Sequence, residues 1–276
     1  MPTIATLGPS QTISERAARE YAGIRGDDSS VVLYPSFRRA FHAVGEECEF
    51  GLLPIENMVE GYVQPVLDLL LHSDLNIIDE LVVPVEFSFV ANCAERDAVE
   101  RIYAQFVAQG QCTDFLETME NAEIVTTQSN GLSLEKVKAG QPNEGAIVPR
   151  FVLHDNEFGL TVKNVNDFPN NRTRFIAIAR DEAEFVEGTE YKTSLVVIEG
   201  MDRPGMLAEI LAAFSKRKIN LVSIMSRPTK ETLGKYHFFI DIEGHGSASH
   251  IEDALAEIQR HNFVRSLGSY PKAQQS

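Results

Sequence analysis

The stretch Thr3–Tyr21, TIATLGPSQTISERAAREY, joins a short apolar run to an amphipathic segment through a Gly-Pro turn. Its first part, Thr3–Leu7, has the length and the apolar content of a buried strand. Ile13, Ala17 and Tyr21 then recur at helical spacing. A strand that passes through a tight turn into a helix is the repeating unit of layered α/β proteins, so this stretch predicts an α/β fold.

The same alternation continues through the first two-thirds of the chain. Further strands are predicted at 31–34, 51–55, 76–90, 101–104, 124–127, 146–148 and 173–179. Between them, Val63, Val66, Leu67 and Leu70 show helical spacing. The alternation predicts a mainly parallel sheet. Pro84 interrupts the longest apolar run, which predicts a crossover from one lobe to another.

A change of pattern after residue 180 predicts a second domain. The segment Arg180–Lys192 is rich in acidic residues and lacks periodicity, which is typical of a linker. Strands are then predicted at 193–198, 221–224, 235–243 and 263–267, with two helices among them, the first opened by Pro204. The order βαββαβ predicts an antiparallel sheet backed by two helices. We therefore expect one domain at 1–182 and another at 190–276.

The composition is that of a globular protein with a strongly acidic surface. Of the 276 residues, 43% are hydrophobic and 24% are charged, which is enough apolar material for a sizeable core. The formal net charge of −15 repels phosphate backbones, so nucleic acid is not an expected partner. An anionic substrate would need a locally positive pocket.

The cysteines and the N-terminus predict a cytoplasmic protein. Cys48, Cys93 and Cys112 are widely spaced and form no CxxC or Cys/His pattern, so no zinc site is expected. Scattered single thiols are typical of a reducing compartment. The N-terminal sequence lacks the pattern of a signal peptide, and no stretch approaches the length of a membrane span. No membrane partner is expected.

Two segments place polar groups at the ends of predicted strands. After the first strand, Thr12 and Glu15 have the spacing of a capping box, and the N–H groups of the following helical turn can hold a carboxylate. The segment Pro54–Gly61 places Glu56 and Asn57 at the carboxyl end of a strand, where α/β folds bind ligands. The structural interpretations are a capped helix in the first case and a capping Asn beside a surface Glu in the second.

A third segment, Asn171–Phe175, places the hydroxyl of Thr173 between two arginines at the start of an apolar strand. This arrangement predicts an anion pocket that carries a hydroxyl donor. The structural interpretation is a solvated strand edge.

Together and in this order, the three segments resemble the prephenate dehydratase family, which has Gly-Pro-x-Gly-Thr-Phe-Ser, Pro-Ile-Glu-Asn-x-x-x-Gly and Asn-x-Thr-Arg-Phe. The C-terminal module resembles the ACT domain of that family through Arg203–Leu207, Met225–Pro228 and Leu267–Pro271. Gln11 stands where the family has Gly, which predicts backbone strain if this position needs a positive φ. The segment Ser129–Gly131 replaces a Ser-Thr-Ser-type sequence.

The resemblance implies two α/β lobes around a cleft, like a hinged periplasmic binding protein, followed by a ferredoxin-like ACT domain. It implies a carbon–oxygen lyase of phenylalanine biosynthesis that converts prephenate into phenylpyruvate, water and carbon dioxide without a metal or organic cofactor. Thr173 would donate a hydrogen bond to the departing hydroxyl, Asn57 and Gln111 would hold the polar groups of the substrate, and Arg174 would offset its charge. The residues expected to bind substrate are Thr12, Ser14, Glu56, Ser129, Asn171, Arg174 and Phe175.

The resemblance also implies regulation. ACT modules pair and bind an amino acid between them, so we expect a homodimer or homotetramer that phenylalanine inhibits. The expected effector site consists of Gly205, Met206, Leu207, Asn220, Ser226, Arg227 and Pro228.

Three alternatives stay open at the level of the sequence. An arogenate dehydratase would share the same motifs. A prephenate decarboxylase would keep the ring hydroxyl and would not need the Thr173 hydroxyl. A two-lobed binding protein with an ACT sensor is compatible with the departures from the family pattern at Gln11, Met58 and Ala104.

Overall fold

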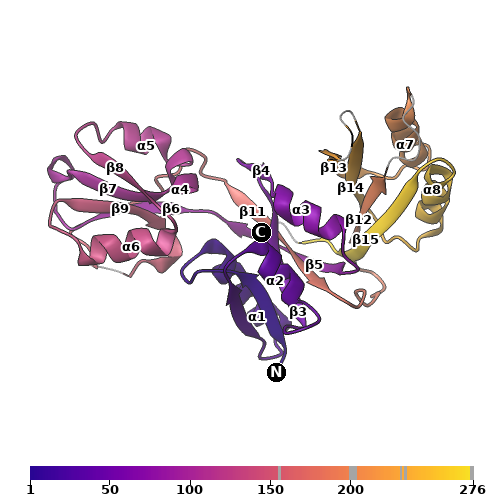
Figure 1. Ribbon diagram of the computed structural model, residues 1–276, viewed down its shortest axis with the longest axis horizontal. Helices are drawn as coiled ribbons and strands as arrows, with labels where there is room; N and C mark the ends of the chain where they lie inside the picture. Colours follow the sequence, from indigo (N-terminus) through magenta and orange to yellow (C-terminus); the bar gives the residue numbers. More distant parts are fainter. Residues whose placement is uncertain (155–156, 199–203, 231, 233–234, 274–276) are drawn as a thin grey trace. The chain divides into compact units, whose positions relative to one another are not determined.

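The computed structural model describes residues 1–154, 157–198, 204–230, 232 and 235–273 (Figure 1). Contacts between residues divide the chain into two compact units. The first unit consists of Met1–Val66 and Val82–Phe175, and the second consists of Leu67–Leu81 and Ile176–Ser276.

The first sheet has a parallel centre. β1 (Thr3–Leu7) pairs in parallel with β2 (Ser30–Tyr34) and with β3 (Phe50–Asn57). The strand order is β2-β1-β3-β11-β5, and the short β4 (Gly61–Tyr62) runs antiparallel to β3. The other elements of this part are α1 (Ile13–Arg25), α2 (Phe37–Ala43), α3 (Gln64–Leu71), β5 (Asn76–Pro84) and β11 (Arg172–Ala179). α3, β5 and β11 each pass from one unit into the other.

The second sheet lies wholly in the first unit and has the order β10-β6-β9-β7-β8. Its strands are β6 (Phe87–Ala91), β7 (Arg101–Gln105), β8 (Glu123–Thr127), β9 (Glu144–Pro149) and β10 (Leu160–Lys163). The helices with them are α4 (Phe106–Gly110), α5 (Thr113–Glu117) and α6 (Asn130–Ala139), with single 3₁₀ turns at Arg96–Ala98 and Arg150–Val152. Phe89, Ile102 and Ile147 are fully buried in its core.

The predicted crossover at Pro84 is confirmed, because β5 ends there in the first sheet and β6 belongs to the second. The prediction of a mainly parallel sheet needs correction, since both sheets are mixed. In the second sheet, β7 pairs in parallel with β8 and with β9. The chain enters this sheet through β6 and leaves it through β10, and β6 pairs antiparallel with both β9 and β10. Hydrophobic periodicity reports which residues are buried and carries no information on the direction of the neighbouring strand.

The C-terminal part of the second unit has the predicted βαββαβ order. Its antiparallel sheet has the order β13-β14-β12-β15. The elements are β12 (Tyr191–Ile198), α7 (Met206–Ser215), β13 (Leu221–Pro228), β14 (Tyr236–Glu243), α8 (Ser249–Gln259) and β15 (Phe263–Pro271). Ile210 and Phe214 of α7 and Ile251 of α8 join Leu195 and Ile240 of the sheet in one buried core.

The segment Leu67–Leu81 packs with the C-terminal module in the second unit. Asp68 of α3 accepts two hydrogen bonds from Arg227 of β13, from Nε and from Nη2, at 2.8 Å each. Glu80 of β5 forms an ion pair of 2.8 Å with Lys192 of β12, and both side chains are buried. Arg265 of β15 donates to the backbone carbonyls of the last turn of α3. The second unit is therefore held together by charged pairs as well as by its apolar core.

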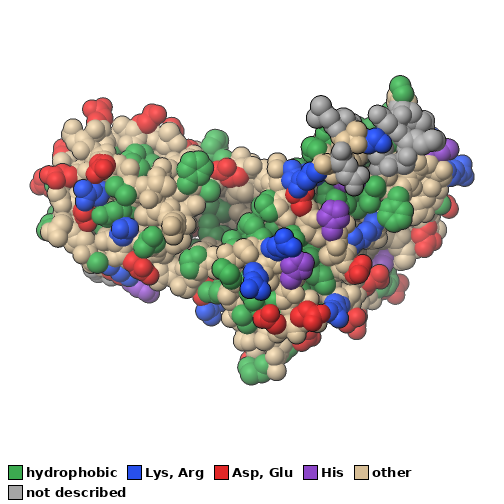
Figure 2. All heavy atoms as spheres, viewed as in Figure 1, with side chains coloured by type: hydrophobic (Ala, Val, Ile, Leu, Met, Phe, Trp, Pro, Cys, Tyr) green, Lys and Arg blue, Asp and Glu red, His purple; other side chains and the backbone are tan. Residues whose placement is uncertain are grey.

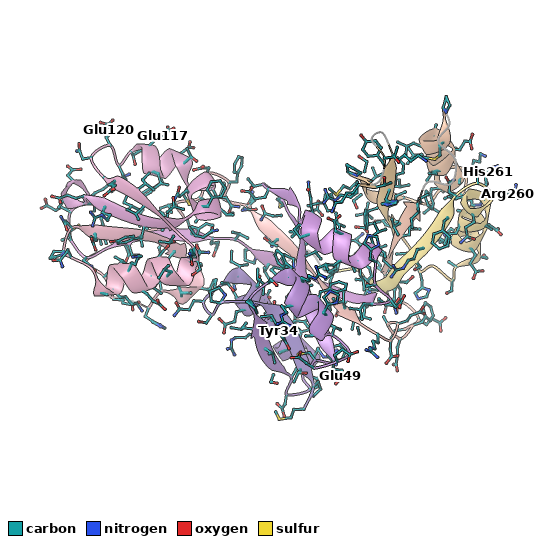
Figure 3. The ribbon with its side chains drawn as sticks, in the orientation of Figure 1. Tyr34, Glu49, Glu117, Glu120, Arg260 and His261 are labelled. Carbon is teal, nitrogen blue, oxygen red and sulfur yellow. The ribbon has the colours of Figure 1, made fainter. Side chains whose placement is uncertain are left out.

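Acidic and basic side chains are interspersed over the face seen in Figure 2. Glu117, the last residue of α5, and Glu120, shortly after it, are exposed (Figure 3). In the described part of the chain, every helix is too short or too polar to cross a membrane.

Candidate active site

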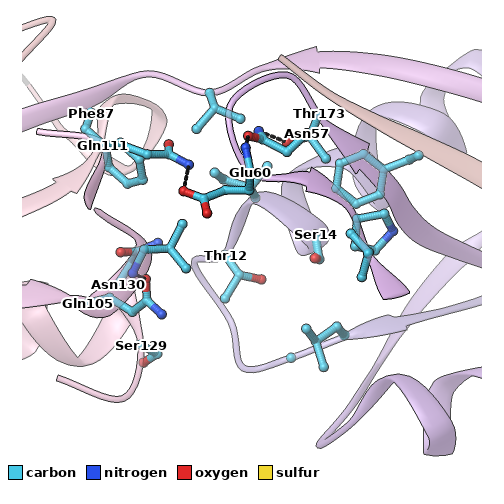
Figure 4. Close-up of a pocket in the computed structure, with 18 of the residues that line it drawn as sticks. Thr12, Ser14, Asn57, Glu60, Phe87, Gln105, Gln111, Ser129, Asn130 and Thr173 are labelled. Atoms are coloured by element: carbon cyan, nitrogen blue, oxygen red, sulfur yellow. Dashed lines mark hydrogen bonds between the residues drawn. The ribbon is translucent and has the colours of Figure 1, made fainter. Parts of the chain in front are cut away.

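A pocket of about 420 Å³ lies in the first unit (Figure 4). It is formed at the carboxyl ends of four strands, since Gly8, Asn57, Gln105 and Gln128 line it and lie at or just after the ends of β1, β3, β7 and β8. Its other polar lining residues include Thr12, Ser14, Glu60, Gln111, Ser129, Asn130 and Thr173, and its apolar ones include Val85, Phe87 and Phe175. Ligands of α/β proteins bind at this edge of a sheet.

A chain of hydrogen-bonded amides lies at this pocket. Asn57 Nδ2 donates to Asn171 Oδ1 at 3.0 Å, and Asn171 Nδ2 donates to Gln111 Oε1 at 2.9 Å. Gln111 Nε2 then donates to Glu60 Oε1 at 3.2 Å. Asn57, Gln111 and Asn171 are buried. Buried amides whose donors and acceptors are satisfied hold one another rigidly, so these hydrogen-bonded amides provide a fixed polar wall.

Asn57 also orients the hydroxyl of Thr173. Its Nδ2 donates to Thr173 Oγ1 at 2.9 Å. The hydroxyl oxygen is the acceptor in this bond, so the hydroxyl hydrogen stays available. Within the described ranges, no group of the protein accepts that hydrogen. Thr173 is therefore arranged to donate a hydrogen bond to a molecule bound in the pocket.

The orientation of the Asn57 amide is itself determined by the backbone. Asn57 Oδ1 accepts hydrogen bonds from the N–H groups of Val59 and Glu60, each at 3.0 Å. The amide nitrogen must then face Thr173 and Asn171. The Asn57 side chain therefore makes two kinds of contact, because its oxygen shapes the turn and its nitrogen positions Thr173.

The pocket is polar, but it contains no cationic side chain among its described lining residues, where Glu60 is the one charged group. Positive potential is available from the N-termini of α1 and α6, whose capping residues Thr12 and Ser129 line the pocket. Thr12 Oγ1 accepts from Glu15 N–H at 3.3 Å, as predicted, and Ser129 Oγ accepts from Leu132 N–H at 3.1 Å.

The structure brings most of the predicted site residues together. Those that line the pocket are Thr12, Ser14, Asn57, Gln111, Ser129, Thr173 and Phe175. Asn171 is buried next to them in the amide chain.

Two predicted site residues, Glu56 and Arg174, do not line the pocket. Arg174 Nε lies 3.5 Å from a carboxylate oxygen of Glu56. Arg174 lies between Thr173 and Phe175 on β11, and successive side chains of a strand point to opposite faces of the sheet. Arg174 is therefore not part of the described pocket lining, whereas the N-termini of α1 and α6 present N–H groups there.

The pocket lining also includes residues outside the list of expected substrate-binding residues. Glu60, Gln105 and Asn130 line the pocket, and Phe87 forms part of its apolar wall. Glu60 lies three residues after Asn57, within the segment Pro54–Gly61 that was expected to place polar groups at a ligand site. Its charged side chain in that segment was the signal that could have identified it. Gln105 and Asn130 follow strand ends, a position that indicates a ligand edge only after the strand order is known.

Gln11 has a backbone φ of 64°, so the predicted strain at this position is present. Gly131, in the Ser129–Gly131 segment that also departs from the family pattern, leaves space for the Gln11 side chain. A Cβ atom at Gly131 would lie 3.1 Å from the carbonyl oxygen of Ser10 and 3.4 Å from Oε1 of Gln11. The absence of a side chain at Gly131 makes room for Gln11, so the two departures are spatially coupled.

The predicted effector residues divide into two groups. Gly205 has a φ of 90° at the N-cap of α7, Leu207 is exposed, and Asn220, Ser226 and Pro228 are exposed. Met206 packs against the core of the module, and Arg227 is engaged by Asp68. Arg203, at the start of this motif, lies outside the described residues.

Comparisons with known proteins agree with this arrangement. The model of the prephenate dehydratase family matches residues 4–183, and that of the ACT domain matches residues 194–260. The chain is 32% identical over 273 residues to a bifunctional chorismate mutase/prephenate dehydratase of Aquifex aeolicus, covering 98% of this chain and 74% of the relative. It is 30% identical over 267 residues to the prephenate dehydratase of Methanocaldococcus jannaschii, covering 95% and 96% of the two chains.

Solved structures show the same similarity. The prephenate dehydratase of Arthrobacter aurescens, solved in complex with L-Phe, is 33% identical, with a TM-score of 0.84 and coverage of 98% of this chain and 90% of that one. The prephenate dehydratase of Staphylococcus aureus has a TM-score of 0.81 at 25% identity, covering 98% and 100% of the two chains. The pocket motifs, the βαββαβ module and these full-length matches lead to one conclusion: the chain belongs to the prephenate dehydratase family and carries a C-terminal ACT domain.

Proposed function

We propose that this chain is a prephenate dehydratase, a carbon–oxygen lyase that converts prephenate into phenylpyruvate, water and carbon dioxide. The observation that carries the proposal is the Thr173 hydroxyl, whose oxygen accepts from Asn57 and whose hydrogen is free to bond a ligand in the pocket. A decarboxylase that keeps the ring hydroxyl would have no use for such a donor. Family membership supports the same reaction.

The reaction removes two groups from opposite positions of the cyclohexadiene ring. The bond from the ring to its carboxylate breaks, the electron pair enters the ring, and the carbon–oxygen bond of the ring hydroxyl breaks. The ring becomes aromatic, which makes the overall change favourable. Hydroxide is a poor leaving group, so a hydrogen bond from Thr173 to the departing oxygen lowers the barrier. A positioned group of this kind contributes about 10²–10⁴-fold to the rate.

In the proposed complex, the carboxylates of prephenate bind without a Lys or Arg side chain among the described lining residues. The first turns of α1 and α6 present N–H groups and positive dipole ends to the pocket. Ser14, which lines the pocket, supplies a further hydroxyl donor. The apolar wall formed by Val85, Phe87 and Phe175 suits the ring.

Product identification tests this function and separates it from the alternatives. The purified full-length chain is incubated with prephenate or with arogenate, and the products are identified by mass and by absorbance. Phenylpyruvate formed from prephenate supports the proposal. Faster turnover of arogenate to phenylalanine indicates an arogenate dehydratase, and a non-aromatic hydroxylated product indicates a decarboxylase. No turnover of either compound would leave a binding protein.

Regulation by phenylalanine is part of the proposal. Gly205 leaves open space at the start of α7, and a Cβ placed there would meet no atom within 4 Å. Free N–H groups at this helix start can take the carboxylate of an amino acid. The L-Phe complex of the Arthrobacter relative supports phenylalanine as the ligand. Binding that favours one arrangement of two ACT modules would inhibit turnover through a coupling free energy of about 1–3 kcal/mol.

Pairing of two chains and a cytoplasmic location complete the proposal. β13 is an edge strand of the four-stranded sheet, and Val222 and Ile224 on it are exposed. An exposed apolar edge strand is covered in most proteins. Because ACT modules pair, a second copy of this module would cover β13, in a homodimer or a homotetramer. Three free cysteines suit a reducing compartment.

Calorimetry tests the effector site. Phenylalanine is titrated into the wild-type chain and into a Gly205→Val variant, and the mass of the particle is measured by light scattering with and without phenylalanine. Heat with the wild type that is lost in the variant supports the site, since a β-branched residue does not adopt a φ of 90°. No heat with phenylalanine or tyrosine in the wild type would leave the module as a scaffold.

A further inference from the structure

The proposed reaction consumes a proton that Thr173, Asn57 and Gln111 do not supply. Prephenate enters as a dianion, and phenylpyruvate leaves with one carboxylate, whereas carbon dioxide and water are neutral. One proton is therefore taken up in each turnover. Thr173 can donate a hydrogen bond, but its alkoxide is too basic for the hydroxyl to give up its proton outright. The amides of Asn57 and Gln111 do not titrate.

Glu60 is the one carboxyl group among the described residues that line the pocket. The other titratable lining residue, Tyr62, is a phenol, and phenols ordinarily titrate near pH 10, so they are weaker acids. On the neighbouring strands, Glu56 and Arg174 pair with each other away from the pocket. The nearest chemical source of a proton is therefore the side chain of Glu60.

Glu60 and Thr173 contact opposite ends of the same amide. The Glu60 N–H donates to Asn57 Oδ1 at 3.0 Å, and Asn57 Nδ2 donates to Thr173 Oγ1 at 2.9 Å. The Glu60 carboxylate projects toward Gln111 in Figure 4, and Oε1 accepts the bond from that amide. Within the part of the chain that the structure describes, Oε2 makes no hydrogen bond, and Glu60 is exposed at the pocket lining.

We propose that Glu60 is the general acid that protonates the departing ring hydroxyl, an inference that rests on the proposed dehydratase function. In this step the carboxyl O–H bond of Glu60 breaks as the carbon–oxygen bond of the substrate breaks, and the hydroxide leaves as water. Thr173 holds the departing oxygen through its hydrogen bond. Carbon dioxide leaves at the opposite position of the ring, and Glu60 is left as a carboxylate.

The charge of the bound substrate favours an acid at this position of the pocket. Two substrate carboxylates enter a pocket whose described lining has no Lys or Arg, next to a third carboxylate. Like charges at close range favour the neutral form of one of them, so a carboxyl group beside the bound dianion is suited to act as an acid.

A Glu60→Gln variant is the decisive test. Gln keeps an acceptor for Gln111 Nε2 and nearly the same shape, but it has no acidic proton. We expect kcat to fall by about 10²–10⁴-fold. KM should stay level or fall, because a negative charge that repels the substrate is removed. A Glu60→Asp variant, which restores an acid on a shorter side chain, should recover part of the loss.

The pH dependence of kcat separates an acid from a merely positioning residue. The wild type should lose activity as the pH rises and the general acid loses its proton, and this limb should be absent from the residual activity of Glu60→Gln. Proton uptake gives a readout without turnover. A Thr173→Val variant mixed with prephenate in a weakly buffered solution should take up close to one proton per site at neutral pH, and a Thr173→Val, Glu60→Gln double variant should take up none.

The failures of the two proposals are distinguishable. A wild type that makes no phenylpyruvate overturns the dehydratase function. A wild type that makes it, beside a Glu60→Gln variant of similar kcat and unchanged pH profile, overturns the role of Glu60 alone. Loss of arogenate turnover in Glu60→Gln with prephenate turnover kept would show that Glu60 receives an ammonium group, and would equally overturn it.

Discussion

Asp68 on α3 and Arg227 on β13 form a two-pronged ion pair, with Nε–Oδ1 and Nη2–Oδ2 distances of 2.8 Å each. α3 begins at Gln64, directly after Val63 of the pocket lining. Arg227, one of the expected effector residues, is bound in this structure by the carboxylate of Asp68.

The pair also predicts how stability depends on pH. The Arg227 guanidinium lowers the pKa of Asp68 from its ordinary value near 3.8 to about 2. Because the folded-state pKa is depressed, the stabilisation is fully present above about pH 4 and is lost as the pH falls toward 2. After solvent screening it amounts to about 1–2 kcal/mol.

An Arg227→Gln variant should therefore unfold about 1–2 kcal/mol more easily at pH 7, and the difference from the wild type should shrink at pH 2.5. Urea denaturation at the two pH values measures it. Lys230→Gln is the matched control, since Lys230 also contacts Asp68 but is 64% exposed, so its loss should cost under about 0.5 kcal/mol. Equal differences at both pH values would contradict the assignment.

Replacing Thr173 by Val removes the hydroxyl and keeps the shape of the side chain. We expect kcat to fall by at least about 10²-fold, with a much smaller change in KM. Asn57 Nδ2 keeps its bonds to Asn171 Oδ1 and to the carbonyl of Arg172, so the amide chain should survive. Steady-state kinetics with prephenate measures both parameters, and Thr173→Ser should restore most of the rate.

The neighbouring residue on the strand provides the control. Arg174 does not line the pocket, so Arg174→Gln should change kcat by less than Thr173→Val and should act mainly on stability through the lost pairing with Glu56. A large loss of substrate affinity in Arg174→Gln, with folding intact, would show that the guanidinium moves into the pocket when substrate binds.

Gln11→Gly should stabilise the protein. A non-glycine residue at a φ of 64° costs about 1–2 kcal/mol relative to its preferred conformation, and Gly removes most of that cost. We expect a gain of about 1 kcal/mol in the free energy of unfolding, measured by urea denaturation. A double-mutant cycle with Gly131→Ser tests the coupling, because that substitution should cost less once Gln11 is gone. Additive effects would mean that the two positions are independent.

The buried pair of Lys192 and Glu80 should be costly to break from one side. Lys192→Met removes the ammonium group that pairs with the Glu80 carboxylate, whose side chain is 1% exposed, and should destabilise the second unit by about 3–5 kcal/mol. The Lys192→Met, Glu80→Gln double variant should recover much of the loss. Lys216→Met serves as the exposed control in the same unit, since Lys216 is 64% exposed and pairs with Glu257 at the surface. Thermal unfolding compares the three, and similar losses for Lys192→Met and Lys216→Met would refute the argument.

The sequence by itself determined the local elements and their order. The strand–turn–helix start, the Thr12 cap, the break at Pro84 and the βαββαβ module all follow from periodicity and turn chemistry over a few residues, so no distant contact is needed to predict them. The combination of short motifs likewise indicated the family. Even the positive φ of Gln11 was readable, because a turn geometry that favours Gly is a local property.

Only the tertiary structure decided which of these residues meet. Thr173 and Arg174 are adjacent in the chain, and the face that each presents depends on how β11 pairs with its neighbours. Asn57, Gln111 and Asn171 are far apart in the sequence, and their donors and acceptors match only when three elements come together. Glu60 became a candidate acid only when the described lining residues proved to include no other carboxyl group, since the chemistry of a side chain is set by its neighbours in space.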